Sequence, residues 1–277
     1  MRTVHCMSYG VPVTISASGD DLFAALPNLL PFATQINSAQ VAGAQSFTLL
    51  PPDEHHGYRC YSGAELTQES AESGPVLEQL ACDLIVHVAD FCPDRVFVHA
   101  GVVGWRDQAL VLPGRSFAGK TTLTAALVRA GATYFSDEYA VVDEEGWVHP
   151  YARDLQMREP GKAEQRSTPV ESFRGHAATT RSRVAQVVFA DYQPGALWNP
   201  QPVTAGMAIL ELMRHAIPVQ RTPRRVMSTL TAMVESATAW SSARGEADAV
   251  AHSLLRALEP ARTSETRTLR QEEAWLR

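Results

Sequence analysis

Short alternating runs of hydrophobic and polar residues occupy the first third of the chain. They predict strands around residues 11–15, 47–50 and 58–61 and a helix near 20–26, because prolines and glycines separate these segments. Six apolar residues then recur at helical spacing after a Gly-Pro pair: Leu77, Leu80, Ala81, Leu84, Ile85 and Val88. That spacing predicts a helix of several turns that packs one face against a core.

The middle of the chain has the order strand, strand, loop, helix. Residues 95–105 and 108–112 predict two strands that a tight turn would join as a hairpin. The second strand runs into a glycine-rich loop, and residues 121–130 then show helical spacing that ends at Gly131, a natural left-handed cap. A strand before such a loop and a helix after it is the order that phosphate binding requires.

Further strands are predicted at residues 133–143, 146–151 and 184–192. Residues 159–183 are polar and without a period, so we expect a loop there. The rest of the chain is expected to be mostly helical, with two apolar helix faces: Val226, Leu230, Met233, Val234 and Ala237, and Val250, Leu254 and Leu258.

These elements predict an α/β protein in two parts. Residues 1–92 would form a small α+β portion ending in a helix, and residues 93–277 a P-loop domain whose mixed sheet is flanked by helices. The hairpin before the loop argues against a purely parallel sheet. With 277 residues, 45% of them hydrophobic, the chain can bury a substantial core.

Composition narrows the classes of partner. The net charge is -6 and no long run of lysine or arginine is present, so nucleic acid is not an expected partner. Cys6, Cys60, Cys82 and Cys92 show neither a CxxC pair nor zinc-ligand spacing, which indicates reduced thiols in a cytoplasmic protein. The first residues lack the pattern of a signal peptide, and we expect no membrane insertion.

The string Gly114-Arg-Ser-Phe-Ala-Gly119-Lys120-Thr121 satisfies G-x-x-x-x-G-K-[ST]. In such a loop backbone amides surround phosphates, the lysine reaches the outer ones and the last hydroxyl holds Mg²⁺. The residues expected to bind ATP are Gly114, Arg115, Ser116, Phe117, Ala118, Gly119, Lys120, Thr121 and Thr122. The alternative is a glycine-rich turn with a solvated lysine, although a chain of this length would contain the string by chance only roughly once in a hundred cases.

Two adjacent acids and a histidine are the other candidates for chemistry. Asp137 and Glu138 follow a short apolar strand just after the loop's helix, where one acid can hold Mg²⁺ and the other can accept a proton. The alternative is an exposed pair at a strand end. His99 lies within an apolar strand, on the face opposite Val98 and Ala100, where a lone histidine is more often structural.

Three segments together carry a resemblance to a known family. Val98-His99-Ala100-Gly101, the loop GRSFAGKT and Tyr134-Phe-Ser-Asp137-Glu138 occur in the order and spacing of the catalytic domain of the HPr kinase/phosphorylase family. Phosphoenolpyruvate carboxykinase is a more distant structural relative of that family. The resemblance covers about residues 95–158.

The resemblance implies transfer of the γ-phosphate of ATP to a serine hydroxyl. Asp137 would be the base, Lys120 would bind phosphate, and His99 would tune Asp137 or touch the reacting phosphate. Glu138 and Thr121 would lie near Mg²⁺. Residues 154–158 loosely match a later family segment ending in arginine, which makes Arg158 a phosphate clamp, with an exposed surface arginine as the alternative.

The chain also departs from the family pattern. Phe117 and Glu138 stand where the family has a glycine and a second aspartate, and the first ninety residues do not resemble the N-terminal domain of the bifunctional enzymes. The chain looks more like stand-alone members that accompany peptide-modifying clusters, including the lasso-peptide kinases. The acceptor is then a serine of a peptide or protein, or the hydroxyl of a small metabolite. A regulatory module that senses ATP without transferring phosphate is the rival reading, and a homo-oligomer stays open.

Overall fold

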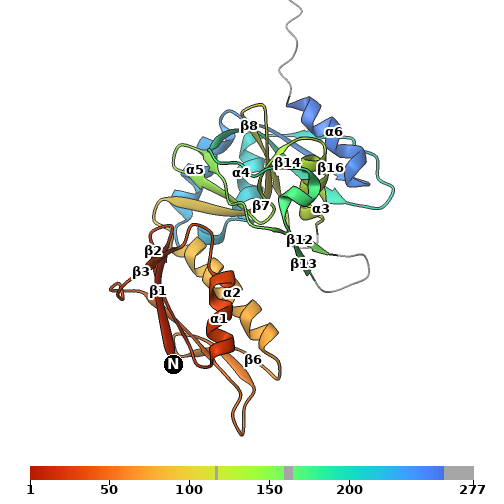
Figure 1. Cartoon of the computed structure of the whole chain (residues 1–277). Helices are drawn as coiled ribbons and strands as arrows, with labels where there is room; N and C mark the ends of the chain where they lie inside the picture. The colour runs from red at the N-terminus through yellow and green to blue at the C-terminus, as the bar shows by residue number, and fades with distance from the viewer. Residues whose placement is uncertain (116–117, 159–164, 259–277) are drawn as a thin grey trace, which may run out of the picture.

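Two large β-sheets organise the computed structural model, which describes residues 1–115, 118–158 and 165–258 (Figure 1). In the described part of the chain the first sheet has six strands in the order β3-β1-β2-β4-β5-β6. Their bounds are β1 (Arg2–Ser8), β2 (Val11–Ala17), β3 (Gln35–Asn37), β4 (Gln45–Leu50), β5 (Tyr58–Ser62) and β6 (Glu65–Ser70). Helices α1 (Asp20–Leu29) and α2 (Ser73–Phe91) share one core with this sheet.

The second sheet is mixed, and within the described residues it has eight strands in the order β11-β10-β7-β8-β14-β16-β15, with β9 paired to β7. Its strands are β7 (Arg95–Trp105), β8 (Gln108–Pro113), β9 (Thr133–Ser136), β10 (Tyr139–Asp143), β11 (Trp147–His149), β14 (Ser182–Tyr192), β15 (Gln201–Val203) and β16 (Thr238–Arg244). Strand β14 runs parallel to β8 and to β16, whereas β7 and β8 form the expected antiparallel hairpin. The predicted mixed α/β class is therefore confirmed.

Helices cover both faces of the second sheet. On one face α3 (Lys120–Arg129) and α6 (Ala247–Ala257) share a core with Leu110 and Val188. On the other face α4 (Ala205–Met213) and α5 (Pro223–Val234) share a core with Val98 and Ala100. Alternation of side chains along each strand supplies the two apolar faces.

A cluster of aromatic rings joins the two sheets. Tyr9, in the turn between β1 and β2, packs edge-on against Phe97 of β7 with a centroid distance of 5.2 Å. The ring of Tyr151 lies 6.4 Å from Tyr9 and 5.7 Å from Tyr139, and Phe32 completes the group. Tyr139, the first residue of β10, belongs to this cluster and follows Asp137-Glu138 directly in the chain.

The structure corrects one prediction about secondary structure, the loop at residues 159–183, and adds detail to two others. Residues 133–143 form β9 and β10 with a turn between them. Part of the expected 159–183 loop is ordered, since β13 (Gln165–Thr168) pairs with β12 (Leu155–Arg158) and a 3₁₀ helix covers Val170–Phe173. The region expected to be mostly helical contains β16, whose order comes from parallel pairing with β14 rather than from a strong local pattern.

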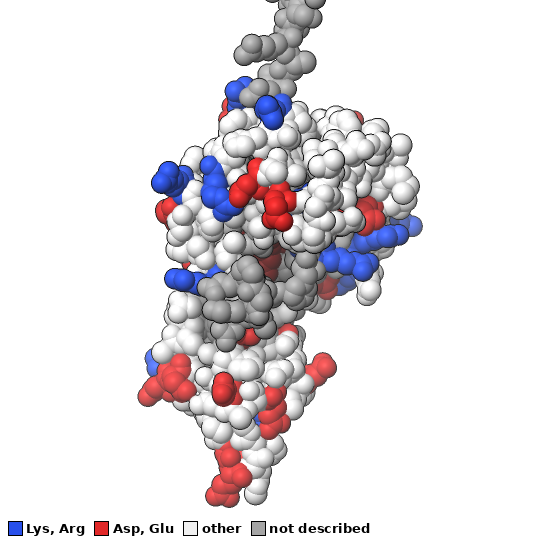
Figure 2. All heavy atoms as spheres, turned by 90° about the vertical axis from the view of Figure 1, so that its right-hand side faces the viewer, with Lys and Arg blue, Asp and Glu red and all other residues white. Residues whose placement is uncertain are grey.

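The surface shows charges of both signs. On the face drawn in Figure 2, acidic side chains predominate over the lower, N-terminal part, and basic and acidic side chains alternate over the upper part. Among the described residues, no helix combines the length and apolar character needed to cross a bilayer. The four cysteines are free thiols.

Candidate functional site

The glycine loop (residues 114–121) connects the carboxyl end of β8 to the start of α3. The amide of Ala118 donates to Arg115 O over 3.2 Å, and Lys120 Nζ donates to the same oxygen over 2.9 Å. Gly119 precedes α3 with a φ of +78°, a conformation that favours glycine. A Cβ at Gly114 would lie 3.3 Å from Ala118 Cβ. The described residues on either side of positions 116–117 thus lie close together, with the ammonium group of Lys120 held against Arg115.

The remaining residues predicted to bind ATP are Thr121, Thr122, Ser116, Phe117 and Arg158. Thr121 is half-buried on the first turn of α3, and Thr122 is exposed beside it. Ser116 and Phe117 lie outside the described residues. The backbone of Arg158 ends β12, where it pairs with Gln165.

A buried arginine supports the loop from behind. Arg244, at the end of β16, is 2% exposed, and its Nη2 donates to Gly119 O over 2.8 Å while Nη1 donates to Gly245 O over 3.0 Å. The guanidinium lies 5.3 Å from the ring centroid of Tyr192. A Cβ on Gly119 would collide with this guanidinium, so both the backbone angle and the close approach require glycine there.

A serine-capped turn explains why the strand breaks at the two acids. Ser136 Oγ accepts hydrogen bonds from Glu138 N over 3.0 Å and from Tyr139 N over 2.9 Å. Such side-chain bonds compete with strand pairing and stabilise a turn. Asp137 and Glu138 therefore leave the sheet at the turn between β9 and β10, next to the start of α3.

The carboxylate of Asp137 is buried and hydrogen-bonded. Tyr134 Oη donates to Asp137 Oδ1 over 2.8 Å, and Gln156 N donates to Oδ2 over 3.3 Å. Burial raises the pKa of Asp137, and these bonds oppose part of that rise. The nearby hydroxyl of Thr121 also lowers the pKa of Asp137. Tyr134 Oη also lies 2.9 Å from Arg153 O, so one phenol proton serves two acceptors.

Glu138 is the second acid of the turn. Burial raises its pKa, the charge of Arg153 acts against this rise, and the neighbouring Asp137 adds to it. Lys120 also lowers the pKa of Glu138, which brings the loop's ammonium and both carboxylates within electrostatic reach of one another. Carboxylate and hydroxyl oxygens from Glu138 and Thr121 are donors of the kind that Mg²⁺ prefers. Groups of three or more His, Cys, Asp or Glu that would suit a metal ion are absent from the described part of the chain.

Lys120 and His99 both have lowered pKa values. Burial lowers the pKa of Lys120 to about 8, although Asp137 and Glu138 favour its charged form. Burial lowers the pKa of His99 to about 4, with further contributions from the charges of Lys120 and His215. His99 is therefore neutral at pH 7, and its ring lies 5.9 Å from that of Tyr139. The structure brings His99, Lys120 and the acid pair together.

A pocket of about 470 Å³ adjoins the other side of the glycine loop. Besides loop residues, it is lined by the ends of β14, β15 and β16 and by α4. Its lining includes Phe189, Asp191, Val203, Met207, Glu211 and His215. We call this side the pocket flank, and the side with Tyr134, Asp137 and Glu138 the carboxylate flank.

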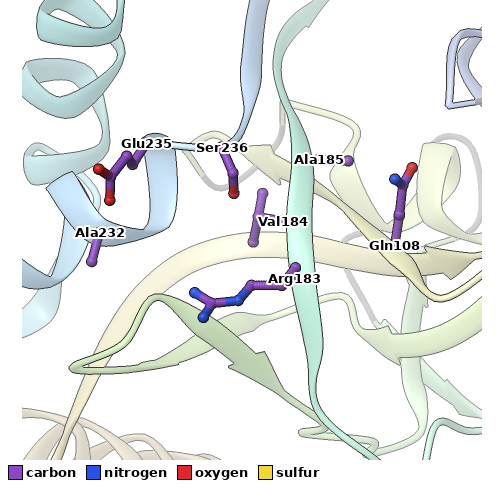
Figure 3. A pocket seen from close by; sticks show the side chains of 7 residues that line it. All are labelled: Gln108, Arg183, Val184, Ala185, Ala232, Glu235 and Ser236. Carbon is purple, nitrogen blue, oxygen red and sulfur yellow. The ribbon is translucent and has the colours of Figure 1, made fainter. Parts of the chain in front are cut away.

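A second pocket, of about 430 Å³, lies at the opposite ends of the strands, where β8 and β14 begin (Figure 3). It is lined by Gln108 and Arg183 at the starts of β8 and β14, and by Glu235 and Ser236 after α5. Arg183 already has structural partners there, because its guanidinium donates to Glu145 O and lies 4.2 Å from the ring centroid of Trp147. The catalytic candidates all lie at the other end of these strands.

Sequence reasoning missed several residues of the site. Arg244 lies in a region expected to be mostly helical, and Arg153 and His215 belong to segments without a motif. Tyr134 is part of the quoted family segment, but no local signal shows that its phenol binds Asp137. These contacts join residues distant in sequence, or depend on the exact shape of the turn between β9 and β10.

Comparisons with known proteins add little to this geometry. No family model matches the sequence, and no curated protein matches it. Among solved structures, the chain is similar to the Hpr(Ser) kinase/phosphatase from Coxiella burnetii, with 10% identity and a TM-score of 0.33. The match covers 58% of this chain and 94% of the other. It is a distant similarity at the level of the fold, and we base no inference on it.

Proposed function

We propose that this protein is a kinase that transfers the γ-phosphate of ATP to a hydroxyl group, with a serine of a peptide or protein as the acceptor. The observation that carries the proposal is Asp137, a buried carboxylate oriented by hydrogen bonds and within electrostatic reach of Lys120. Lys120 begins the helix that follows a G-x-x-x-x-G-K-T loop. A base beside the end of a phosphate loop is the arrangement that phosphoryl transfer requires.

Asp137 is the proposed base. A raised pKa makes a carboxylate a better proton acceptor at neutral pH, and burial raises that of Asp137. The acceptor oxygen forms a bond to the γ-phosphorus as its proton passes to Asp137, and the bond from the γ-phosphorus to the bridging oxygen breaks, releasing ADP. Tyr134 and Gln156 hold the carboxylate in one orientation during this step.

Loop residues position the phosphates. Lys120 exchanges its bond to Arg115 O for phosphate oxygens, and the backbone amides at the start of α3 add donors. Mg²⁺, when bound, supplies charge neutralisation at the β- and γ-phosphates, with Thr121 and Glu138 as protein ligands. Neutral His99 offers a ring hydrogen bond without adding charge. Catalysis then rests on positioning and charge stabilisation.

The serine acceptor is supported by the three-part motif resemblance described above, and a metabolite hydroxyl is the other acceptor class. The test is incubation of the protein, and of its Lys120→Ala variant, with Mg²⁺ and γ-labelled ATP in size-fractionated extract of the source cells. Label on a serine peptide that depends on Lys120 is the expected result. Label on a small metabolite reassigns the acceptor, and ATP binding without any label overturns the kinase in favour of an ATP-sensing module.

A further inference from the structure

The pocket flank and the carboxylate flank lie on opposite faces of the second sheet. Asp137 accepts a hydrogen bond from Tyr134, and Tyr134 packs in the core that α3 shares with the sheet. The pocket is lined by Met207 and Glu211 of α4, which covers the other face. Gly114, Arg115 and Ala118 line the pocket, and Lys120 is within electrostatic reach of Asp137 and Glu138, so described residues of the loop adjoin both sites.

This arrangement fixes the direction of a bound nucleotide. Under the proposed function, on which this inference rests, the terminal phosphate lies beside Asp137 and the preceding phosphates lie along the loop. The nucleoside is at the other end of the triphosphate, and therefore leaves the loop on the side away from Asp137. Gly114, Arg115 and Ala118 of the loop form one wall of the pocket on that side.

The chemistry of the pocket fits a nucleoside. Phe189 and Val203 are half-buried and Met207 is 61% exposed, which gives the pocket an apolar wall for a planar base. A thioether next to an aromatic ring is a favourable contact. Asp191 and Glu211 carry acceptor oxygens that suit ribose hydroxyls. Glu211 also lies 3.4 Å from Arg214 Nη1 and 3.7 Å from His215 Nε2, which hold its carboxylate at the pocket. The volume, about 470 Å³, lies in the range of small-molecule sites.

We infer that this pocket holds the base and ribose of the nucleotide whose phosphates bind the glycine loop. Met207 contacts the base, and the carboxylates of Asp191 and Glu211 accept hydrogen bonds from the ribose hydroxyls. The pocket is thus the specificity site that distinguishes a nucleoside triphosphate from inorganic triphosphate.

The test compares two substitutions on one helix by titration calorimetry. Met207 and Leu210 of α4 are both exposed, at 61% and 57%, but only Met207 is among the residues that line the pocket as described. Met207→Asp is expected to weaken ATP binding about tenfold and to leave the binding of inorganic triphosphate nearly unchanged. Leu210→Asp is the matched control and is expected to leave both unchanged. Thermal unfolding of each variant verifies the fold.

The outcomes separate the inference from the function on which it rests. ATP binding that Met207→Asp leaves intact, or an equal loss with Leu210→Asp, overturns the nucleoside pocket alone. Failure of the parent protein to bind either ATP or triphosphate overturns the proposed function as well. A second arm uses 2′,3′-dideoxy-ATP: the parent is expected to bind it more weakly than ATP, and an Asp191→Asn/Glu211→Gln double variant is expected to lose that preference. A parent that binds both equally refutes the ribose contacts.

Discussion

The two flanks of the glycine loop differ in how far their polar groups are removed from water. On the carboxylate flank Asp137 is 7% exposed and accepts hydrogen bonds from Tyr134 and Gln156, so its orientation is set before any ligand binds. On the pocket flank Asp191 and Met207 are exposed on an open surface. Burial raises the pKa values of Asp137 and Glu138 on the carboxylate flank, whereas the pocket flank offers exposed surface that a ligand can contact. Under the proposed function, phosphate transfer takes place on the carboxylate flank and recognition of the nucleoside on the pocket flank.

Replacing the proposed base tests the carboxylate flank most severely. Asp137→Asn keeps the shape and removes the proton acceptor, and is expected to lower the phosphotransfer rate by about a thousandfold with ATP affinity retained. Single-turnover transfer and calorimetry on the same sample measure the two quantities. Asp248→Asn, on the surface of α6, is the control. A variant as active as the parent would assign the base to another group.

Removing the ammonium group of Lys120 tests both flanks, because under the proposed function the phosphates of ATP extend from one flank to the other. Lys120→Ala is expected to weaken binding of ATP and of inorganic triphosphate alike, by about a hundredfold, since a charge-assisted contact is lost in a partly buried site. Arg129→Ala, a cation at the other end of α3 that pairs with Asp248, should change neither affinity. Unequal losses for the two ligands would mean that Lys120 does not contact phosphate.

The pH dependence of ATP binding tests whether burial lowers the pKa of Lys120. Lys120 has a pKa of about 8 in the protein without ligand, so its charge is present below pH 8 and is lost above it. Affinity for ATP is therefore expected to fall about tenfold between pH 7 and pH 9. In Lys120→Arg the guanidinium stays charged, and the fall should disappear. An equal fall in both proteins would contradict the assignment.

The smallest expected effect concerns the orientation of the base. Tyr134→Phe removes the phenol that donates to Asp137 Oδ1, and should lower the transfer rate by about threefold to tenfold. That bond lowers the pKa of Asp137, so its loss raises the pKa, and the acid limb of the pH–rate profile should move to higher pH. Stability alone would change the rate without moving this limb. Phe135→Leu provides a packing control from the same strand.

The parts of the fold and of the candidate site that could be predicted are those set by short stretches of sequence. The loop string and the hairpin before it are local patterns, and the structure has β8 before residues 114–119 and α3 after them, as expected. The sequence also places the acid pair at the end of a short apolar strand, but the hydrogen bonds to Ser136 Oγ that define the turn have no local signal. Strand β16 and its Arg244 depend on pairing with β14 and contact with Gly119, which no short window of sequence records.

The aromatic cluster beneath the acid turn bears on how the chain unfolds. Tyr9 comes from the first sheet, yet its ring packs against Phe97 and lies beside Tyr151 of the second part. Each aromatic side chain buries about 150–250 Å² of surface, so loss of Tyr9 and Phe32 would expose apolar area directly under the strand that follows Asp137-Glu138. We therefore expect the two sheets to unfold cooperatively. Unfolding of the first sheet would remove packing from the residues next to Asp137 and Glu138 in the second.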